Sequence, residues 1–583
     1  MGPVQSKPAK RPAKSLIEDW LPKSVVVLRD YDRHKFFSDL IAGLTVGLVA
    51  LPLAMAFAIS SGVPPESGIY CAIVAGFLIS ALGGSKTQIG GPTGAFVVIV
   101  AGIVARHGIE GLFICTGMAG VFLIIMGATG FGAAVKFIPR PVVIGFTNGI
   151  AVLIASTQIK DFFGLRIDHV PSEFLQRMET LGLHWNTLSA EATLLAGACL
   201  VLMILWPKLT SKVPGTIVAL FAGTVAALLL GWHVDTIGSR FGGIPSGLPR
   251  IEIPPFHFRM VPALLGPALT ITMLGAIESL MSAVVSDRMS NDKHNPNVEL
   301  IGQGIANFVS PLFGGLPATG AIARTATNIR SGAKTPVAGM VHALVLLAML
   351  LFAAPLAKFI PLPVLAAILI VVAYHMGEWQ EIPDILRLSK SDISVWIVTF
   401  LLTVFADLTV AVEAGMILAT LLFIRKVAVT TTVSAVTDAY VDEGRVHILQ
   451  DKTIPDYVRI YRIHGPFLFG ATEKLAVIRD HLSDLPPIVV LRLRNMTAID
   501  ATGLGALEDT ADLLHRSGRE LILCGARPQP AQLMHQARFE EHVGPENICP
   551  NVQAALERAK RVYDDGMSLK KQFTPRAVAA NVS

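Results

Sequence analysis

The feature that most constrains this chain is a long stretch that is almost free of charge. Leu40 to Ala105 is 66 residues long and contains only two charged side chains, Glu66 and Lys86. A helix needs about 20 mostly apolar residues to cross the bilayer core, so this stretch is long enough for several. Charged residues make up 16% of the whole chain, well below the roughly 25% of soluble domains. These observations predict a polytopic membrane protein and exclude a single soluble enzyme, a nucleic-acid binder and a secreted disulfide scaffold.

The last quarter of the chain has a different composition. From Val436 to Asp565, 34 of 130 residues are charged, about 26%, which is typical of a soluble domain. Eight Lys and Arg residues precede Asp39, and the positive-inside rule places such a segment in the cytoplasm. We therefore predict four parts, which are an N-terminal segment over 1–37, a transmembrane transport domain over 38–426, a soluble domain over 436–565 and a tail over 566–583.

Fourteen apolar runs separated by glycine, proline or charge follow one another in the membrane part. An even number of spans returns the C-terminus to the side of the basic N-terminus, so we predict an inner-membrane protein with both termini in the cytoplasm. The runs lie near 38–60, 67–83, 93–105, 111–131, 140–160, 187–206, 215–231, 262–285, 296–313, 318–330, 336–354, 360–376, 391–407 and 409–425.

Two of these runs are too short to cross a membrane. Thr93–Ala105 and Ala318–Arg330 are each 13 residues long, about 20 Å as a helix. Each follows helix-breaking residues, Gly90-Gly91-Pro92 in the first case and Gly314-Gly315-Leu316-Pro317 in the second. Such segments are tolerated at membrane depth only when they are buried in protein or face a cavity, so we predict two half-helices.

The half-helices belong to an internal repeat. Thr93-Gly94-Ala95-Phe96 is echoed by Thr319-Gly320-Ala321-Ile322 at an offset of 226. Phe137-Ile138-Pro139-Arg140-Pro141-Val142 is echoed by Phe359-Ile360-Pro361-Leu362-Pro363-Val364 at an offset of 222. The two echoes predict homologous halves of seven segments each, over about 38–231 and 262–426. An odd number of spans per half forces opposite orientations, and an inverted repeat with broken helices is typical of a secondary transporter.

The starts of the two half-helices form a candidate anion site. Each start carries unpaired backbone N–H groups and the positive end of a helix dipole, and small residues there let a ligand approach closely. Arg324, about one turn into the second half-helix, adds a positive charge, and a guanidinium at this depth needs a partner or a cavity. A tight helix start without a ligand and a structurally paired arginine remain as alternatives. The candidate substrate-binding residues are Thr93, Gly94, Ala95, Phe96, Thr319, Gly320, Ala321 and Arg324.

Glu278 is a carboxyl in the middle of the apolar run 262–285. Burial away from water favours the protonated form of such a group. A glutamate that takes up a proton with the anion and releases it inside would couple uptake to the proton gradient. Ser282 follows at i+4 on the same helix face, where it can hydrogen-bond Glu278 or the substrate. The alternative is a structural tie in which Glu278 stays paired with Arg324, and the two roles can coexist.

Several strings resemble the SulP sulfate permease family, from about Asp39 to the end of the soluble domain. They are Gly62-Val63-Pro64-Pro65, Gly91-Pro92-Thr93-Gly94, Gly145-Phe146-Thr147-Asn148-Gly149-Ile150 and NVELIGQGIAN over 297–307. The resemblance implies an α-helical membrane protein with a UraA-like 7+7 inverted repeat, in which a core domain moves against a gate domain. It also implies a homodimer, a cytoplasmic STAS domain, and Phe57 and Phe96 as apolar walls of the substrate cavity.

Two further strings, QIKDFFGL over 158–165 and IESL over 277–280, are similar to the bacterial C4-dicarboxylate branch of this family. Sodium-coupled bicarbonate transporters of the family tend to place Asp where this chain has Glu278, which favours protons over sodium. Leu53 stands where many relatives carry Gln, so a hydrogen bond to the substrate in those relatives is expected to be missing here. Sulfate, dicarboxylates and bicarbonate are all small oxyanions, and the choice among them stays open.

Strands and helices alternate in the soluble domain, which predicts a small α/β layer domain. We expect strands at 457–462, 488–494 and 520–525 and helices at 473–484 and 504–516. The string Ile499-Asp500-Ala501-Thr502-Gly503-Leu504-Gly505 resembles a STAS domain. In anti-sigma-factor-antagonist relatives a phosphorylated Ser follows that Asp, so Ala501 excludes phosphorylation at this position. Thr502 is expected to cap the following helix beside Asp500.

The combined hypothesis is a secondary active transporter of small anions, sulfate or a C4-dicarboxylate, that works as a proton symporter by alternating access. Sodium-coupled bicarbonate uptake and a non-transporting membrane sensor with STAS output are the alternatives. No triad spacing, metal cluster or phosphate loop in the sequence points to an enzyme. We expect the proton gradient to be the driving force, without a cofactor. The expected partners are the anion, the lipid bilayer, a second copy of the chain and a cytoplasmic protein that docks on the STAS domain, with no nucleic acid.

Overall fold

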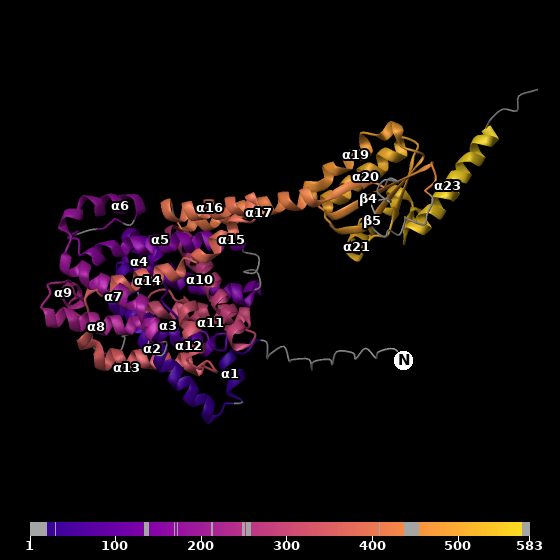
Figure 1. The fold of residues 1–583 in the computed structure, drawn as a ribbon. Coiled ribbons are helices and arrows are strands. Elements are labelled where there is room, and N and C mark those ends of the chain that lie inside the picture. Colours follow the sequence, from indigo (N-terminus) through magenta and orange to yellow (C-terminus); the bar gives the residue numbers. More distant parts are fainter. Residues whose placement is uncertain are drawn as a thin grey trace, which may run out of the picture. The chain divides into compact units, whose positions relative to one another are not determined.

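The structure is a computed structural model that describes residues 20–29, 31–132, 139–167, 170–171, 173–210, 214–245, 247, 251, 258–406, 408–436 and 454–573. It divides into two compact units, Met1–Ala419 and Thr420–Ser583, whose elements are labelled in Figure 1. Residues 1–19 of the predicted N-terminal segment and 574–583 of the predicted tail lie outside the described residues, and the four predicted domain boundaries stay predictions.

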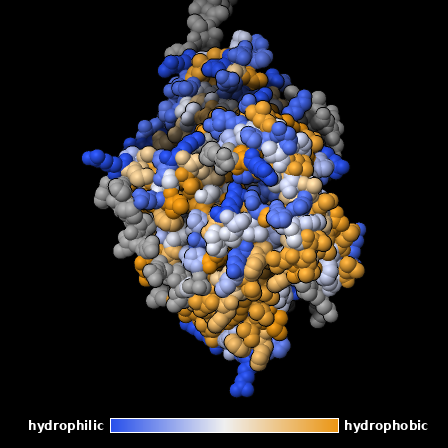
Figure 2. All heavy atoms as spheres, turned by 90° about the vertical axis from the view of Figure 1, so that its left-hand side faces the viewer, coloured by the Kyte–Doolittle hydropathy of each residue, from blue (hydrophilic) through white to orange (hydrophobic). Residues whose placement is uncertain are grey.

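The first unit is built from apolar helices. Within the described residues, eight helical runs are long and apolar enough to cross a membrane, and α8 (Gly215–Leu230) is a shorter apolar helix. Large apolar side chains such as Leu229 and Phe352 are more than 80% exposed, and Figure 2 shows apolar residues over wide parts of the visible surface. Such surfaces are rare on soluble proteins and suit contact with lipid. The eight runs are α2 (Arg33–Ser60), α3 (Pro65–Leu82), α4 (Gly94–Ala128), α5 (Arg140–Phe163), α7 (Ala190–Leu209), α10 (Val261–Ser290), α13 (Val337–Ala357) and Leu362–Leu386, which contains α14 (Leu362–Met376) and α15 (Ile382–Leu386).

The helices follow the same order in two halves. In each half a long helix and a second helix lead into a two-residue strand, and a short helix comes next. In the first half this short helix is the first part of α4, which breaks at Gly108, a residue in the left-handed region with φ of 69°. The first half contains α2, α3, β1 (Gly90–Gly91), α4, α5, α7 and α8, and the second contains α10, α11 (Pro296–Val309), β2 (Thr319–Gly320), α12 (Ile322–Arg330), α13, α14, α16 (Lys390–Phe405) and α17 (Leu408–Thr430). This order agrees with the predicted duplication, while the count of fourteen spans stays a prediction.

The two sequence echoes have different outcomes in the structure. Pro139 and Pro361 cap the N-termini of α5 and α14 with similar backbone angles, φ of −67° and −74°, so this echo marks equivalent positions. Phe137 and Ile138 of the same echo lie outside the described residues. The other echo is shifted, because α4 begins at Gly94 whereas α12 begins at Ile322, an offset of 322 − 94 = 228 instead of 226.

The shift arises because Thr319 and Gly320 form a strand and do not begin the helix, which corrects the predicted half-helix over 318–330. Gly320 pairs with Gly90, and Thr319 pairs with Gly91, in an antiparallel ladder. A Cβ on Gly90 would lie 2.3 Å from Ile79 Cδ1, and a Cβ on Gly320 would lie 1.7 Å from Gln88 Nε2. The packing of Ile79 against Gly90, and of Gln88 against Gly320, therefore leaves no room for a larger residue at either position.

Short elements complete the first unit. They connect the apolar helices and carry several of the polar contacts at its surface. They are α1 (Lys23–Leu28), α6 (Phe174–Leu183), η3 (Trp185–Thr187), α9 (Ile237–Phe241), η4 (Phe258–Met260), η5 (Ser310–Phe313) and η6 (Trp379–Glu381).

The second unit is an α/β domain around a five-stranded sheet of order β3-β4-β5-β6-β7. The strand β3 is antiparallel to β4, and the remaining pairs are parallel. One face of the sheet packs against α20, and the other packs against α23. The elements are β3 (Thr432–Ala435), β4 (Val458–Phe467), η7 (Phe469–Leu475), α19 (Ala476–Arg479), η8 (Leu482–Asp484), β5 (Ile488–Ile499), α20 (Ala501–Arg516), β6 (Glu520–Cys524), α21 (Pro528–Gln536), α22 (Glu540–Val543), η9 (Pro545–Asn547), β7 (Ile548–Cys549) and α23 (Val552–Phe573).

The structure confirms the three predicted strands and the helix at 504–516, and it corrects two details. The predicted helix at 473–484 is divided into η7, α19 and η8, although Leu475 and Ile478 keep helical spacing and are buried. The cap of α20 is Asp500 and not Thr502. Asp500 Oδ1 accepts a hydrogen bond from the Gly503 N–H at 2.7 Å, which an extended residue before the helix can do and a residue inside the first turn cannot.

Candidate anion-binding site

The pairing of β1 with β2 brings the starts of the two half-helices, α4 and α12, close to each other. Neither helix has a side-chain cap. The Thr93 hydroxyl makes no capping bond, and Ala321 has no polar side chain that could cap. The first N–H groups of a helix have no partner inside the helix. Two uncapped starts therefore present donors and two positive dipole ends to the same region.

The backbone N–H groups that lack a hydrogen-bond partner, called open donors below, are not all those that the sequence predicted. In the first half, the N–H groups of Gly94 and Ala95 have no partner among the described residues, as predicted. In the second half, the Gly320 N–H donates to Ser279 Oγ at 3.2 Å, and the Ala321 N–H donates to the Ile89 carbonyl at 2.8 Å. The open donors there belong to Ile322, Ala323 and Arg324, because the first intrahelical bond is made by the Thr325 N–H. The sequence analysis missed Ile322 and Ala323, because it matched the two echoes by residue identity and not by where each helix begins.

Arg324 reaches from α12 to the segment before α4. Its side chain is buried, with an exposed fraction of 4%, and Nη2 donates to the Pro92 carbonyl. Its other terminal nitrogen, Nη1, has no hydrogen-bond partner anywhere in the described part of the chain. A Cβ on Gly91 would lie 2.9 Å from Nη1, so the glycine makes room for the guanidinium. A buried cationic donor without a partner is costly, and a bound anion would satisfy it.

Glu278 on α10 lies at the start of the first half-helix. Its Oε2 accepts a hydrogen bond of 3.0 Å from Thr93 Oγ1, so the residue that precedes α4 contacts the carboxyl and leaves the helix uncapped. Both residues are half-buried. Glu278 and Arg324 are both described, and no ion pair joins them, so the permanent tie considered as an alternative is not formed.

Hydroxyl groups fasten α10 to β2 and α12. Ser279 Oγ lies 2.7 Å from Thr319 Oγ1, which also donates to the Gly275 carbonyl at 3.0 Å. Ser282 Oγ lies 3.1 Å from Thr325 Oγ1, so the predicted hydrogen bond from Ser282 to Glu278 is replaced by a bond to the second half-helix. The sequence analysis missed Ser279 and Thr325. Ser279 could have been found from its spacing to Ser282, because hydroxyl residues three apart lie on the same face of a helix.

Apolar side chains border the start of α4. A Cβ on Gly94 would lie 3.3 Å from Phe57 Cε1, 3.1 Å from Ile154 Cδ1 and 3.4 Å from Met376 Sδ. Phe96 is buried and faces α10, where its Cζ lies 3.7 Å from the position of a Cβ on Gly275. The structure thus brings the predicted walls Phe57 and Phe96 to the same helix start. Ile154 and Met376 were missed because apolar residues inside spans carry no distinguishing signal.

Comparison with known proteins agrees with this architecture. Residues 36–399 match the sulfate permease family, and residues 450–555 match the STAS domain. The "Putative sulfate transporter YvdB" of Bacillus subtilis is 41% identical over 522 residues, covering 89% of this chain and 97% of the relative. The bicarbonate transporter BicA of Picosynechococcus is 30% identical over 548 residues, covering 89% of this chain and 94% of the relative. The murine Slc26a9 anion transporter in the inward-facing state superposes with a TM-score of 0.84 at 17% identity, covering 96% of this chain and 97% of that one.

The family matches, in agreement with the fold, show a multi-pass membrane anion transporter with a C-terminal STAS domain, and not an enzyme. The chain belongs to the sulfate permease family.

Proposed function

We propose that this chain takes up a small divalent oxyanion, sulfate or a C4-dicarboxylate, together with a proton, by alternating access. The observation that carries the proposal is the position of Glu278. Its carboxyl contacts Thr93 at the start of the first half-helix and is not ion-paired with Arg324, whose Nη1 is buried without a partner among the described residues. A carboxyl that is not held in a salt bridge can gain and lose a proton during a transport cycle.

The anion would bind between the two half-helix starts. Its donors would be the N–H groups of Gly94 and Ala95 from one side, those of Ile322 and Ala323 from the other, and Arg324 Nη1. Helix N-termini and a guanidinium together favour a doubly charged oxyanion over a neutral ligand. Phe57 and Phe96 would form the apolar wall next to the first start.

Glu278 would bind the proton when the anion binds, because an ionised Glu278 and the anion carry the same sign of charge. An ionised Glu278 repels an anion at the start of α4, whereas a protonated Glu278 does not. When Glu278 is protonated it can donate to Thr93 Oγ1, and the Thr93 hydroxyl is then free to donate to the anion. Binding of the anion and binding of the proton would therefore favour each other, which is the requirement for symport.

The relatives support both the leading substrate and its alternative. The relative at 41% identity is named for sulfate, and the relative at 30% identity is named for bicarbonate. Glu278, where sodium-coupled family members tend to carry Asp, supports protons as the coupling ion. We also propose an inner-membrane location with both termini in the cytoplasm, a homodimer, and a protein partner for the STAS domain.

Uptake into proteoliposomes tests this proposal. Purified chain is reconstituted, and labelled sulfate, succinate and bicarbonate are offered in parallel under an imposed proton gradient or an imposed sodium gradient. We expect sulfate or succinate to accumulate above its outside concentration under the proton gradient alone. Accumulation of bicarbonate under the sodium gradient alone would contradict the proposal and establish the alternative.

A further inference from the structure

One face of the sheet in the second unit changes from apolar to basic along its strands. Side chains alternate between the two faces of a strand, so residues two apart lie on the same face. Ile460 on β4 and Val490 on β5 are buried beneath α23 in this way. The next residues on the same face of these strands are Arg462, Arg492 and, two residues further, Arg494.

The register of the sheet brings these arginines together. Arg462 lies directly beside Arg492 on the neighbouring parallel strand. Burial, and after it the charge of Arg492, lowers the pKa of the Arg462 guanidinium, and burial with the charge of Arg494 does the same for the pKa of Arg492. Arg494 is exposed and forms no ion pair with any carboxylate of the described residues.

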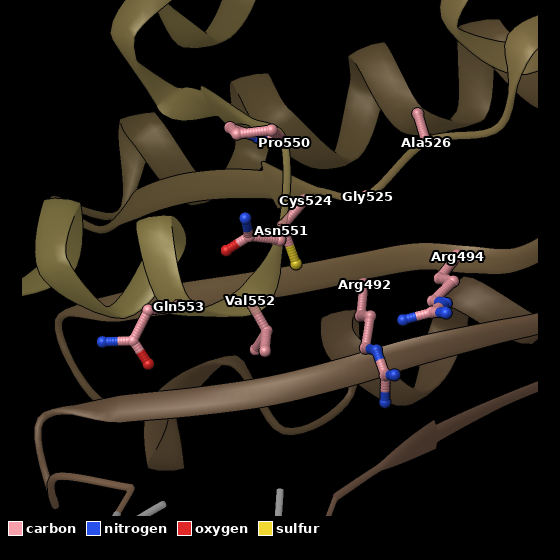
Figure 3. A pocket seen from close by; sticks show the side chains of 9 residues that line it. All are labelled: Arg492, Arg494, Cys524, Gly525, Ala526, Pro550, Asn551, Val552 and Gln553. Carbon is pink, nitrogen blue, oxygen red and sulfur yellow. The ribbon is translucent and has the colours of Figure 1, made fainter. Parts of the chain in front are cut away.

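A cavity of about 360 Å³ opens beside two of these arginines. We call it the basic STAS pocket, and its lining includes Arg492, Arg494, Cys524, Gly525, Asn551 and Gln553. Figure 3 shows the two arginine side chains next to each other on one side of the pocket, with Asn551 and Gln553 on another. Burial raises the pKa of the Cys524 thiol to about 12, so the sulfur adds no negative charge.

The pocket also lies at the start of the 22-residue helix α23. Asn551 caps this helix, since its Oδ1 accepts from the Ala554 N–H at 2.9 Å. Asn551 and the first two residues of the helix, Val552 and Gln553, line the pocket. The positive end of the helix dipole therefore adds to the two guanidinium groups. Paired guanidinium groups and a helix start together suit a phosphate group, which offers several acceptor oxygens and two negative charges.

We propose that the basic STAS pocket binds a small anion that carries a phosphate group, either inorganic phosphate or a phosphorylated metabolite. The volume lies in the lower part of the range of small-molecule sites, which admits either ligand. The pocket belongs to the second unit and the half-helix starts belong to the first, so the proposal does not depend on which anion the membrane domain transports. Arg494 would contact the phosphate from the open side, and Arg492 from the buried side.

Chemical protection of Arg494 in the full-length chain tests the proposal without interference from the transport site. The chain in detergent is labelled with phenylglyoxal, which modifies arginine, and labelling is read residue by residue by peptide mass spectrometry. Arg516, at the end of α20, is likewise exposed and does not line the pocket, so it is an internal control. At ten times its dissociation constant, phosphate occupies about 90% of the sites and should slow the labelling of Arg494 about tenfold. Labelling of Arg516 should not change.

Equal labelling of Arg494 with and without phosphate at matched ionic strength would overturn the proposal, and so would a slowing that Arg516 shares. A second measurement counts bound phosphate. The wild-type chain and the Arg494→Lys variant should each bind one phosphate more per chain than Arg494→Gln, with anion uptake unchanged as the control for folding. An identical count in all three chains would also overturn it. Stronger protection by glycerol 3-phosphate than by inorganic phosphate would identify a phosphorylated metabolite as the ligand, and the reverse order would identify free phosphate.

Discussion

The two half-helix starts occupy equivalent places in the fold but contribute different chemistry. The first, at α4, offers uncapped N–H groups, and the nearest atoms around Gly94 are the ends of flexible side chains such as Phe57 and Met376. The second, at α12, carries Arg324 and is fastened to α10 by the Ser282–Thr325 hydrogen bond. Both ionisable groups of the site, Arg324 and Glu278, come from the second half.

This difference separates the properties that both repeats share, which come from the backbone, from those that depend on individual side chains. Duplication provides two facing helix dipoles, because the dipole is a property of the backbone. Charge that can be gained or lost belongs to particular side chains, and here only one half carries it. The first half thus contributes backbone donors beside apolar side chains, and the second contributes the charged groups. Four sets of substitutions test this division, and they are given in order of decreasing effect.

Glu278→Gln removes the group proposed to carry the proton while keeping its size and its contact with Thr93. We expect accumulation driven by a proton gradient to disappear, so that the inside concentration only reaches the outside concentration. Exchange of labelled for unlabelled anion should survive, because a neutral side chain does not repel the substrate. Paired measurements of gradient-driven uptake and of exchange in proteoliposomes check this, and accumulation with an unchanged pH dependence would refute the coupling role.

Arg324→Gln removes the only cationic side chain placed at the two helix starts within the described residues. A charge-assisted hydrogen bond is worth about 1.5–3 kcal/mol, so substrate affinity should fall about tenfold to a hundredfold. Arg324→Lys should recover part of this loss, since it restores the charge without the fork of donors. Binding of labelled substrate to purified chain measures the affinity of both variants. Wild-type affinity in Arg324→Gln would contradict the proposal that the Arg324 guanidinium binds the anion.

Replacing glycine by alanine at the two half-helix starts compares how tightly each start is packed. A Cβ at Gly320 meets Gln88 Nε2 at 1.7 Å and the Ser279 Cα at 3.1 Å, whereas a Cβ at Gly94 meets only side-chain ends, at 3.1 Å or more. We expect Gly320→Ala to lower the free energy of unfolding by about 1–3 kcal/mol and Gly94→Ala to change it little. Gly102→Ala, where a Cβ meets nothing within 4 Å, is the matched control. Thermal unfolding in detergent ranks the three, and equal stability of Gly320→Ala and Gly94→Ala would remove the distinction.

Thr93→Val deletes the hydroxyl that joins the first half to Glu278 and keeps the shape of the side chain. The loss of one hydrogen bond of about 0.5–1.5 kcal/mol should weaken substrate binding about threefold to tenfold. Thr93→Ser retains the hydroxyl and should behave like the wild type. Substrate affinity measured for both variants decides the point, because an equal loss in Thr93→Ser would mean that shape, and not the hydroxyl, matters.

Hydropathy and helix breakers predicted much of the membrane unit. Apolar helices, the short helices after Gly91-Pro92 and Pro317, and the two charges Arg324 and Glu278 all stand out in the sequence, since a charge or a helix breaker in an apolar run is costly wherever it lies. The STAS strands were found for a similar reason, because alternation of side chains is a local pattern.

Contacts between segments far apart in the chain could not be predicted from such local patterns. The echo of Thr93 in Thr319 suggested equivalent helix starts, yet Thr319 lies in a strand, where it pairs with Gly91. Ser282 shares a helix with Glu278, but its partner is Thr325, 43 residues further along the chain. Nor did the sequence indicate that Arg462 and Arg492 lie side by side, since that depends on the register of two parallel strands.

Three properties could be predicted from the residues alone: the chain spans a membrane in two related halves, two helices are broken within the membrane, and an α/β domain follows. These properties come from the solvation of each residue and from backbone conformation, which act locally. Three others follow from packing: which helix N–H groups lack a partner, that Glu278 hydrogen-bonds Thr93 and forms no salt bridge with Arg324, and that arginines line the basic STAS pocket. Those outcomes depend on distances between segments far apart in the chain, and only packing sets such distances.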